Sequence, residues 1–375
     1  MNYLSVEQLS KRFGDLEILK ELSFGMAKGE KLALIAKNGT GKSTLLNMIA
    51  GLDTPDTGQV VWRKDINVQF LSQDPNFDPE LSIWDAVFQS DNPILKAIRE
   101  YEDCIEHAIE GERFQNALDK IEELEAWDHE VRVKSILSEL KVDNFDTQIK
   151  SLSGGQVKRL ALAKVLIDQP DFLILDEPTN HLDLEMIEWL EKFLVSEKLT
   201  LLMVTHDRYF LENVCNVILE MDDRGLYTYK GNYSYFLEKR EERKQIEQSG
   251  IEKAKNLYRK ELDWMRRQPK ARSTKSKARI DSFYGVEEQA KKRTDEKEVE
   301  LEFNMERLGS KILEFHNISK SFGDKVLFHG FSYKFQRGEK IGIIGPNGAG
   351  KSSFLNLVTE NLEPSPGKVI IGATV

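Results

Sequence analysis

The sequence predicts an α/β fold built around a parallel sheet, and part of this fold is encoded twice. Short apolar runs of strand length, such as Lys31–Ile35, Phe172–Leu175 and Leu199–Val204, alternate with helical patterns through residues 1–225. Such runs are typical of strands buried on both faces of a sheet that helices cover. In addition, residues 10–60 recur without a gap from residue 319, at a constant offset of 309 positions. This match indicates an internal repeat.

The repeat and the changes in composition predict three parts. The first copy continues through further motifs, and we expect its domain to occupy residues 1–234. Residues from about 84 to 150 are charged and rich in glutamate with helical spacing, which indicates a helical insert in this domain. The second copy occupies residues 312–375, and Val375 aligns with position 66 of the first, so we expect an incomplete second domain. Residues 235–307 form a charged linker.

The composition excludes several classes of protein. The longest apolar runs are far shorter than the roughly 20 residues of a membrane helix, and the N-terminus has no apolar signal segment. Two cysteines, Cys104 and Cys215, make neither a disulfide framework nor a zinc motif. We therefore expect a cytoplasmic protein without membrane insertion. The net charge of −10 argues against nucleic-acid binding over the whole surface, so any basic patch must be local.

A glycine-rich loop lies between a predicted strand and a predicted helix in each copy. Backbone N–H groups and a helix N-terminus in such a loop bind phosphate, and the pattern is GxxxxGK[ST]. Residues 345–352 fit it fully, whereas Ala36 replaces the leading glycine in the first copy, which matters only if that position needs a positive φ. Lys42 is expected to reach the β- and γ-phosphates of ATP, and Ser43 to bind Mg²⁺.

The two loops supply the first group of predicted ATP contacts. In the first copy they are Lys37, Asn38, Gly39, Thr40, Gly41, Lys42, Ser43 and Thr44. In the second copy they are Gly345, Pro346, Asn347, Gly348, Ala349, Gly350, Lys351, Ser352 and Ser353.

Acidic and imidazole side chains follow two of the predicted strands. Asp176 and Glu177 end the apolar run that starts at Phe172, and His206 ends the run that starts at Leu199. Ligands bind at the carboxyl ends of strands in a parallel sheet. Asp176 is therefore predicted to bind Mg²⁺, Glu177 to act as general base for water, and His206 to contact the γ-phosphate. The alternative is that the two acids cap a strand and that the histidine is structural.

The segment Leu152-Ser153-Gly154-Gly155-Gln156 is the most specific signal in the chain. A serine and two glycines precede a helical pattern, which predicts a second phosphate cradle, but this cradle has no lysine of its own. Such a loop makes sense if it completes the site of another domain. Ser153, Gly154, Gly155 and Gln156 are therefore predicted ATP contacts.

These motifs, in this order, resemble those of the ATP-binding cassette (ABC) ATPases. The resemblance implies a P-loop ATPase domain with a parallel-sheet core, a β subdomain and a helical subdomain. It also implies that the signature loop of one cassette closes over ATP held by another. Gln73 resembles the Q-loop residue, with a catalytic and metal-binding role, and residues 180–183 resemble the D-loop. His206 resembles the switch histidine. The adenine-stacking aromatics correspond to Phe13 and Phe322, each 29 residues before its lysine. The implied metal ligands are Ser43, Gln73, Asp176 and Ser352.

Three features are similar to the ABC family F (ABC-F). They are two cassettes without a membrane segment, the motifs EPTNHLD and THDRYFL, and a linker turn reading ARSTKSKARIDSF, which is similar to that of the Uup/EttA-like branches. Most studied members of this family act on ribosomes. The resemblance thus implies a tandem ATPase that hydrolyses ATP to control its binding to ribosomal RNA or tRNA, with the second cassette as its partner in cis.

The linker itself also indicates a nucleic-acid partner. Apolar residues recur at helical spacing from Ile251 to Met265, which predicts a helix from about 235 to 267, roughly 50 Å long, that ends near Pro269. A second helix is expected from about Thr274, completing a hairpin. Between Arg259 and Arg279 there are nine basic and two acidic residues, a net charge of +7. The predicted RNA contacts are Arg266, Arg267, Lys270, Arg272, Lys275, Lys277 and Arg279, with Trp264 as a stacking ring.

Alternatives remain open for the target and for the state of this chain. The basic hairpin is also compatible with a Uup-like ATPase that binds branched DNA, or with a charged arm that is merely solvated. An ATPase subunit of a membrane transporter is a third reading. Because the second copy has no Asp-Glu strand or switch histidine of its own in this sequence, we expect the chain to bind ATP through the first cassette but to hydrolyse it weakly. We expect this weak activity to arise from a head-to-tail homodimer that pairs two first cassettes.

Overall fold

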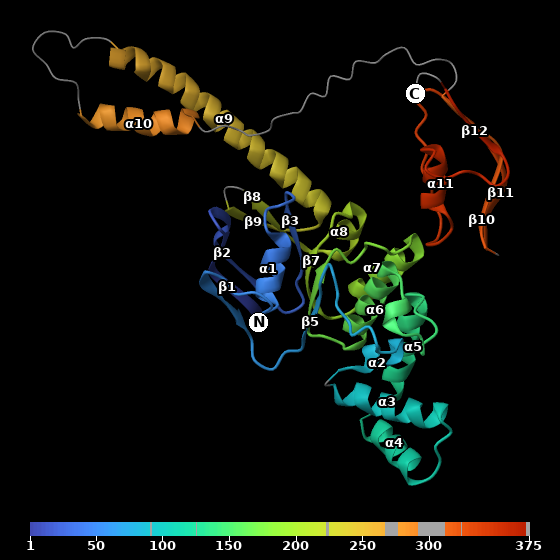
Figure 1. The fold of residues 1–375 in the computed structure, drawn as a ribbon. Helices are drawn as coiled ribbons and strands as arrows, with labels where there is room; N and C mark the ends of the chain where they lie inside the picture. Colours follow the sequence, from blue (N-terminus) through green and yellow to red (C-terminus); the bar gives the residue numbers. More distant parts are fainter. Residues whose placement is uncertain are drawn as a thin grey trace, which may run out of the picture. The chain divides into compact units, whose positions relative to one another are not determined.

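The computed structural model describes residues 1–90, 92–124, 126–222, 225–266, 277–291, 312–323 and 325–372. The chain forms two compact units, one of Met1–Tyr233 together with Arg307–Val375, and the other of Ser234–Glu306. Figure 1 shows the elements of both units, each of which is described by itself. Among the described residues, none of the helices combines the length and apolarity that are required to span a bilayer.

The core of the first unit is a six-stranded sheet in the order β5-β6-β7-β3-β8-β9. Its first five strands run parallel and β9 runs antiparallel to β8. Every residue of β6 and β7 is buried. The predicted α/β fold is therefore confirmed, with the apolar runs as central strands. The strands are β3 (Lys31–Ala36), β5 (Val68–Leu71), β6 (Phe172–Asp176), β7 (Thr200–Val204), β8 (Val217–Asp222) and β9 (Gly225–Lys230).

Helices connect the parallel strands and place their carboxyl ends at one edge of the sheet. The connecting helices are α1 (Lys42–Ile49), α6 (Gly154–Ile167), α7 (Leu184–Ser196) and α8 (Arg208–Val214). Because β3, β6 and β7 are neighbours and parallel, the segments that follow them emerge side by side. These segments carry the first glycine loop, the Asp176-Glu177 pair and His206.

A three-stranded antiparallel sheet forms the β subdomain, in the order β2-β1-β4. Its strands are β1 (Asn2–Phe13), β2 (Leu16–Ala27) and β4 (Thr57–Trp62). The ring of Trp62 meets that of Phe172 edge to face, with centroids 4.8 Å apart, and so joins this subdomain to the parallel sheet. The two sheets consequently share one core.

The repeat builds the same small sheet a second time. Strands β10 (Leu313–Phe322), β11 (Lys325–Phe335) and β12 (Lys368–Ile371) pair in the order β11-β10-β12, the counterpart of β2-β1-β4. In both copies a glycine lies where the backbone of a neighbouring strand comes very close. Gly58 has a φ of 85° and a Cβ there would lie 2.4 Å from the carbonyl oxygen of Gln8. Gly367 has a φ of 113° and a Cβ there would lie 2.4 Å from the Cα of Ile318.

The second copy differs from the first in one strand. Residues 341–345 precede helix α11 (Lys351–Val358) but form no strand, whereas the matching residues 32–36 belong to β3. The reason is that β3 hydrogen-bonds to both β7 and β8, and the positions of the second copy present in this sequence include no counterpart of either strand. Ile344 is accordingly 85% exposed.

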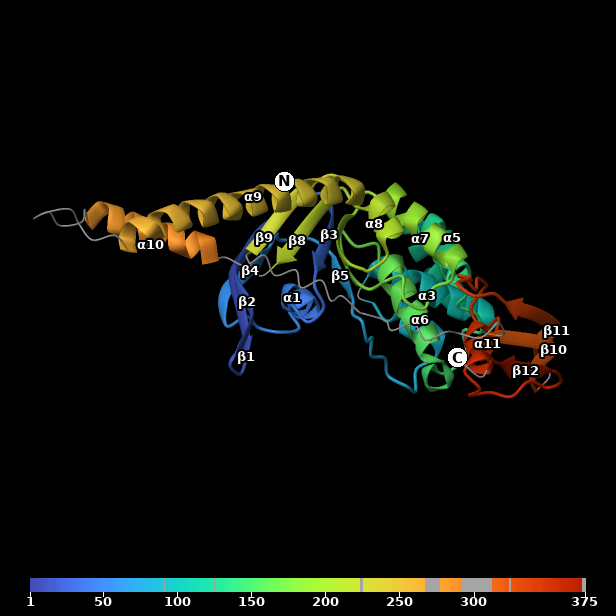
Figure 2. The same cartoon turned by 90° about the horizontal axis from the view of Figure 1, so that it is seen from above.

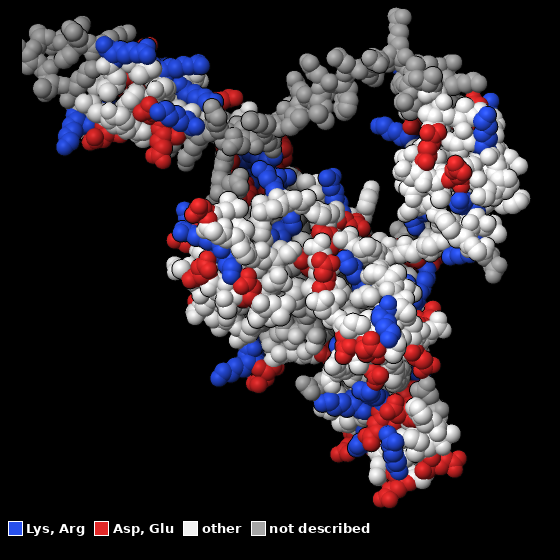
Figure 3. All heavy atoms as spheres, in the orientation of Figure 1, with Lys and Arg blue, Asp and Glu red and all other residues white. Residues whose placement is uncertain are grey.

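The helical subdomain occupies the region in which the sequence predicts a helical insert. It consists of α2 (Ile83–Phe88), α3 (Pro93–Glu106), α4 (Glu112–Glu123) and α5 (Trp127–Glu139). Ser82 accepts a hydrogen bond from the N–H of Asp85 and caps α2, and Asn92 caps α3 in the same way ahead of Pro93. These are the residues that helix N-termini favour, so local sequence sets these two starts. Figure 3 shows acidic and basic side chains mixed over this part of the molecule.

The second unit is a pair of antiparallel helices, α9 (Tyr233–Arg266) and α10 (Lys277–Lys291). Tyr258 stacks on Phe283 with ring centroids 5.4 Å apart, and its hydroxyl lies 3.4 Å from a carboxylate oxygen of Glu287. Later residues of α10 thus contact earlier residues of α9, and both views show the two helices side by side (Figures 1 and 2). The predicted helical hairpin is confirmed. Residues 267–276, which include the predicted helix end near Pro269, lie outside the described residues.

Candidate functional site

The first glycine loop connects β3 to α1. Gly39 and Gly41 adopt φ angles of 81° and 87°, and a Cβ at Gly41 would lie 2.3 Å from Cγ2 of Ile18. Only glycine accommodates such a backbone without strain. The Nζ of Lys42 donates to the carbonyl oxygens of Ala36 and Lys37 at 3.1 and 3.2 Å and lies 3.3 Å from Oδ1 of Asn38. The ammonium group therefore lies over the loop, beside the N-terminus of α1, where an anion is stabilised.

The alanine at position 36 fits the loop. Neither Ala36 nor its counterpart Gly345 has a positive φ. A Cβ at Gly345 would lie 3.5 Å from the Cβ of Ala349, which is ordinary van der Waals contact. Alanine is consequently compatible with the backbone at the leading position of this loop.

Ser43 and Asp176 meet at the start of α1 and the end of β6. The Ser43 hydroxyl donates to the Asp176 carboxylate, which is only 4% exposed. Burial raises the pKa of Asp176, while the hydrogen bond from Ser43 and the charge of Lys42 act in the opposite direction. A hydroxyl beside a carboxylate is the kind of oxygen donor set that suits Mg²⁺ together with phosphate oxygens. Ser43 and Asp176 are therefore suitable ligands for the Mg²⁺ that the resemblance to ABC ATPases implies.

Asp74, which follows the Q-loop residue Gln73, lies near this site, and the sequence analysis did not predict it. Asp74 contributes a negative charge that raises the pKa of Asp176, so its carboxylate lies near the site. Gln73, the predicted ligand, is exposed, and among the described residues its side chain forms no hydrogen bond with Ser43 or Asp176. Its predicted role stays a prediction. The position of Asp74 directly after Gln73 was the sequence feature that could have indicated its place near the site.

Glu177 and His206 lie together at the ends of β6 and β7. The N–H of His206 donates to Oε2 of Glu177 at 3.3 Å, and Nε2 of His206 lies 3.5 Å from Oε1. Burial raises the pKa of Glu177, and the charge and N–H of His206 partly offset this effect. A carboxylate with a raised pKa is a better proton acceptor near neutral pH. Glu177 also has a φ of 53°, a strained backbone of the kind that occurs at functional sites.

Two threonines hold the turns that carry these residues. The hydroxyls of Thr179 and Thr205 lie 3.2 Å apart, and the N–H of Glu177 donates to the carbonyl oxygen of Val204 at 2.8 Å. The two turns are thereby joined across the sheet edge. The sequence argument missed these threonines, although both lie inside the motifs EPTNHLD and THDRYFL.

The signature loop is the capped start of α6. Ser153 and Gln156 form a reciprocal capping box, in which Oε1 of Gln156 accepts from the N–H of Ser153 at 2.9 Å. A Cβ at Gly154 would meet no atom within 4 Å, and one at Gly155 would lie 3.6 Å from the Cβ of His181. The loop therefore offers an open glycine surface next to residues 180–183.

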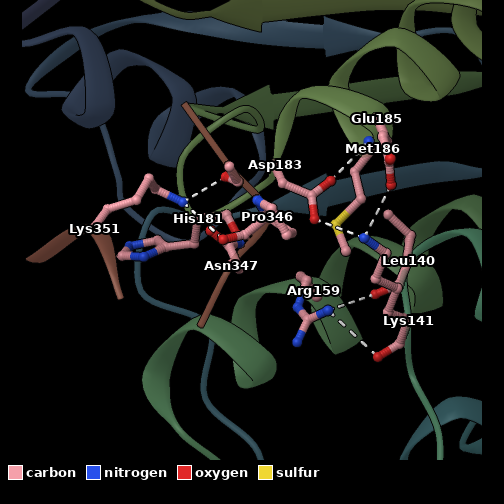
Figure 4. Close-up of polar contacts among 11 residues, drawn as sticks. Leu140, Lys141, Arg159, His181, Asp183, Glu185, Met186, Pro346, Asn347 and Lys351 are labelled. Carbon is pink, nitrogen blue, oxygen red and sulfur yellow. Dashed lines mark hydrogen bonds and ion pairs between the residues drawn. The ribbon is translucent and has the colours of Figure 1, made fainter. Parts of the chain in front are cut away.

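The second glycine loop repeats the geometry of the first. Gly348 and Gly350 have φ angles of 77° and 99°, and Nζ of Lys351 donates to the carbonyl oxygens of Gly345 and Pro346 at 2.7 and 3.0 Å. Ser352 and Ser353 lie in the first turn of α11. Nδ2 of Asn347 donates to the carbonyl oxygen of His181 at 2.7 Å (Figure 4).

The two predicted adenine-stacking rings are exposed, and each lies near a lysine of its own strand. Phe13 and Phe322 are 52% and 54% exposed at the ends of β1 and β10. Nζ of Lys11 lies 5.7 Å from the ring centroid of Phe13, and Nζ of Lys320 lies 5.5 Å from that of Phe322. The sequence argument missed both lysines, although the repeat places them at matching positions.

The predicted nucleic-acid contacts are only partly covered by the structure. Arg266 and Lys277 are exposed at the described ends of α9 and α10, and Arg267, Lys270, Arg272 and Lys275 lie outside the described residues. Arg279 instead binds Glu261 through two hydrogen bonds of 2.8 and 2.9 Å, and its guanidinium lies 4.1 Å from the ring centroid of Trp264. Arg279 and Trp264 therefore stabilise the hairpin, and their predicted role as RNA contacts stays a prediction.

Comparison with known proteins decides the family. The sequence model described as ABC transporter matches residues 19–180 and 328–375, more than half of the chain, and a second model with the same description matches residues 219–303. The energy-dependent translational throttle protein EttA of Escherichia coli (strain K12) is 34% identical over 367 residues, 96% of this chain and 66% of that protein. The chain belongs to the ABC-F family of ABC ATPases.

Another relative is more similar in sequence. The uncharacterized ABC transporter ATP-binding protein YfmR of Bacillus subtilis (strain 168) is 41% identical over 382 residues, all of this chain and 61% of that protein. The chain thus spans less than two thirds of the length of these relatives. Among solved structures, an ATP-binding subunit of an ABC transporter is 19% identical, with a TM-score of 0.47, over 61% of this chain and 90% of that one.

Proposed function

We propose that this ABC-F protein binds ATP with Mg²⁺ at the edge of its parallel sheet and hydrolyses it. The observation that carries the proposal is the convergence of Lys42, Ser43, Asp176, Glu177 and His206 from the ends of three neighbouring strands. Lys42 and the N–H groups of the loop bind the phosphates, and the ring of Phe13 offers a stacking face for adenine. Mg²⁺ held by Ser43 and Asp176 would neutralise phosphate charge.

Glu177 is the proposed general base. Its carboxylate accepts the proton of the attacking water, and its raised pKa suits this task. His206 keeps the carboxylate in place through its N–H and presents its ring toward the phosphate side of the site. With a side chain that is 65% exposed, the histidine is accessible to a nucleotide, whereas the Glu177 side chain is 11% exposed.

The second nucleotide site is proposed to form between the two cassettes. The signature loop at Ser153–Gln156 has no lysine, and the loop at Lys351 has no signature in this sequence, so each supplies what the other needs. The hydrogen bond from Asn347 to His181 supports this pairing, because His181 lies beside Gly155. A head-to-tail homodimer that pairs two first cassettes is a second proposed arrangement of the signature loop and the glycine loop.

The proposed target is the ribosome, reached through the hairpin α9–α10. Similarity to EttA, an energy-dependent translational throttle protein, supports an action on translation. The basic residues around the hairpin turn, among them Arg266 and Lys277, supply the charge that binds phosphates of ribosomal RNA or tRNA. The same charge also suits branched DNA, so the experiment must distinguish the two.

The test uses the full-length protein with Glu177 and its counterpart in the second cassette replaced by glutamine. With ATP added to a cell lysate, sedimentation through sucrose should place this variant in the ribosomal fractions. Replacing Lys270, Arg272, Lys275 and Lys277 with alanine should release it. The matched control, Lys253→Ala with Lys255→Ala, removes exposed charge from α9 away from the turn and should leave binding unchanged. Absence from ribosomes together with retention on branched DNA would overturn the ribosomal assignment.

A further inference from the structure

An ion pair joins the helical subdomain to the segment that follows Glu177. Nζ of Lys141 lies 2.7 Å from Oδ2 of Asp183 and 3.3 Å from Oε2 of Glu185 (Figure 4). Lys141 follows helix α5, whereas Asp183 ends the segment 180–183 and caps α7 by accepting from the N–H of Met186 at 3.1 Å. The Asp183 carboxylate is therefore held by Lys141 and by the N–H of Met186, and a backbone hydrogen bond from Asn347 of the second glycine loop also reaches it. It is only 6% exposed.

The backbone of Lys141 is also held from the signature helix. Lys141 has a φ of 52°, which is strained for a residue other than glycine. Nη1 of Arg159, on α6, donates to the carbonyl oxygen of Leu140 at 3.0 Å and to that of Lys141 at 3.4 Å. Arg159 lies in the second turn of the helix that begins at the signature loop. Lys141 thus connects this helix to the segment 180–183.

The other end of the segment holds the second glycine loop. His181 has a φ of 68°, and its carbonyl oxygen accepts the hydrogen bond from Asn347. Asn347 lies in the loop whose Lys351 covers the carbonyl oxygens of Gly345 and Pro346. Only Leu182 lies between His181 and the Asp183 anchor. The direction of the His181 carbonyl therefore depends on how firmly Asp183 is held.

We propose that Lys141 is a positioning residue for the second nucleotide site. Through Asp183 it fixes the segment 180–183, so that the His181 carbonyl keeps the loop of Lys351 in place for ATP. The proposal rests on the proposed function of that loop. Burial raises the pKa of Asp183, but the hydrogen bond and charge of Lys141, together with backbone hydrogen bonds from Met186 and Asn347, outweigh burial, and the pKa lies below its ordinary value. Removal of Lys141 leaves a buried carboxylate without its cation, and the segment must move to hydrate it.

The experiment separates the two nucleotide sites of the full-length protein. In a Lys42→Ala background, binding of a fluorescent ATP analogue reports the loop of Lys351; in a Lys351→Ala background, it reports the loop of Lys42. Lys141→Met should weaken binding about three- to tenfold in the first background and less than twofold in the second. Asp183→Asn, which retains a side-chain oxygen for the α7 cap, should produce the same pattern.

The double variant and a control complete the test. Because the two residues act as a pair, Lys141→Met combined with Asp183→Asn should be no weaker than either single variant. Lys120→Met breaks an ion pair of similar length but greater exposure, with Glu100 at 2.6 Å, far along the chain from this network, and should leave both sites unchanged. An equal effect of Lys141→Met in both backgrounds, or additive single effects, would overturn the proposal. Failure of both backgrounds to bind ATP with Lys141 intact would instead contradict the proposed function.

Discussion

The N–H of His206 donates to the carboxylate of Glu177, and the imidazole Nε2 lies 3.5 Å from the same carboxylate. The two residues come from different strands and meet only because β6 and β7 are parallel neighbours. His206 thereby orients the residue that we propose as general base.

Glu177→Gln should reduce the ATPase rate of the full-length protein by at least about 100-fold while ATP affinity changes little. The amide keeps the shape of the side chain but cannot accept the proton of the attacking water. Single-turnover hydrolysis and equilibrium ATP binding check this. Glu191→Gln is the matched control, because burial raises the pKa of Glu191 as well but this residue lies on α7 and contacts Asn213. A large rate loss in the control would point to a general structural effect.

His206→Gln should move the acid limb of the pH–rate profile to higher pH. Glu177 acts as a base only when ionised, and its pKa already lies above the ordinary value of 4.5, so activity is lost as the pH falls through this raised pKa. His206 lowers the pKa of Glu177, and its removal raises that pKa further. The dependence of kcat/KM on pH measures the shift. His107→Gln, at the exposed end of α3, should leave the profile unchanged. An unmoved limb in the His206 variant would separate the histidine from Glu177.

Gly41→Ala should abolish detectable ATP binding at the first loop, because the added Cβ meets Ile18 and the backbone is left-handed. Gly29→Ala imposes similar strain, with a φ of 79° and open space around the Cβ, and should leave ATP affinity unchanged. Ala36→Gly should alter affinity by less than about twofold, since position 36 needs no positive φ. Isothermal titration with ATP compares the three variants, and a clear gain of affinity in Ala36→Gly would contradict the account of this loop.

Arg279→Met should loosen the hairpin, because it removes both the two-bonded contact to Glu261 and the cation over Trp264. Hydrogen exchange of the amides in α9 and α10 should become faster around these residues. Glu261→Gln should have a similar but smaller effect, since the stacked guanidinium remains. Lys277→Met, at the exposed start of α10, should leave exchange unchanged. Equal exchange in the Arg279 variant and the unmodified protein would contradict this structural role.

Phe172→Ala should destabilise the first cassette by about 3–5 kcal/mol, the usual cost of removing a fully buried aromatic side chain. Phe172 is completely buried on β6 and contacts Trp62 of the β subdomain edge to face. Val131→Ala, on an exposed side chain of α5, should cost less than about 0.5 kcal/mol. Denaturant unfolding followed by tryptophan fluorescence distinguishes the two, and similar midpoints would argue against a core shared by the two sheets.

The sequence alone determined the α/β fold class, the repeat, the helical subdomain, the hairpin and the family. These features depend on local patterns: buried strands read as continuous apolar runs, Ser82 and Asn92 mark helix starts, and the glycine loops and the segment 152–156 have specific spacing. The predicted roles of Gln73, of the signature loop and of the residues in 267–276 stay predictions.

Only the tertiary structure decided which side chains act together. Lys141 and Asp183 are 42 positions apart, Arg279 and Glu261 are 18 apart, and Thr179 and Thr205 are 26 apart, so no local pattern pairs them. The exposed segment 341–345 also shows that local pattern is insufficient. Its apolar run matches β3, but a strand forms only where neighbouring strands supply hydrogen-bond partners. Periodicity reports which face of an element is buried, whereas the identity of each contact depends on how distant elements pack.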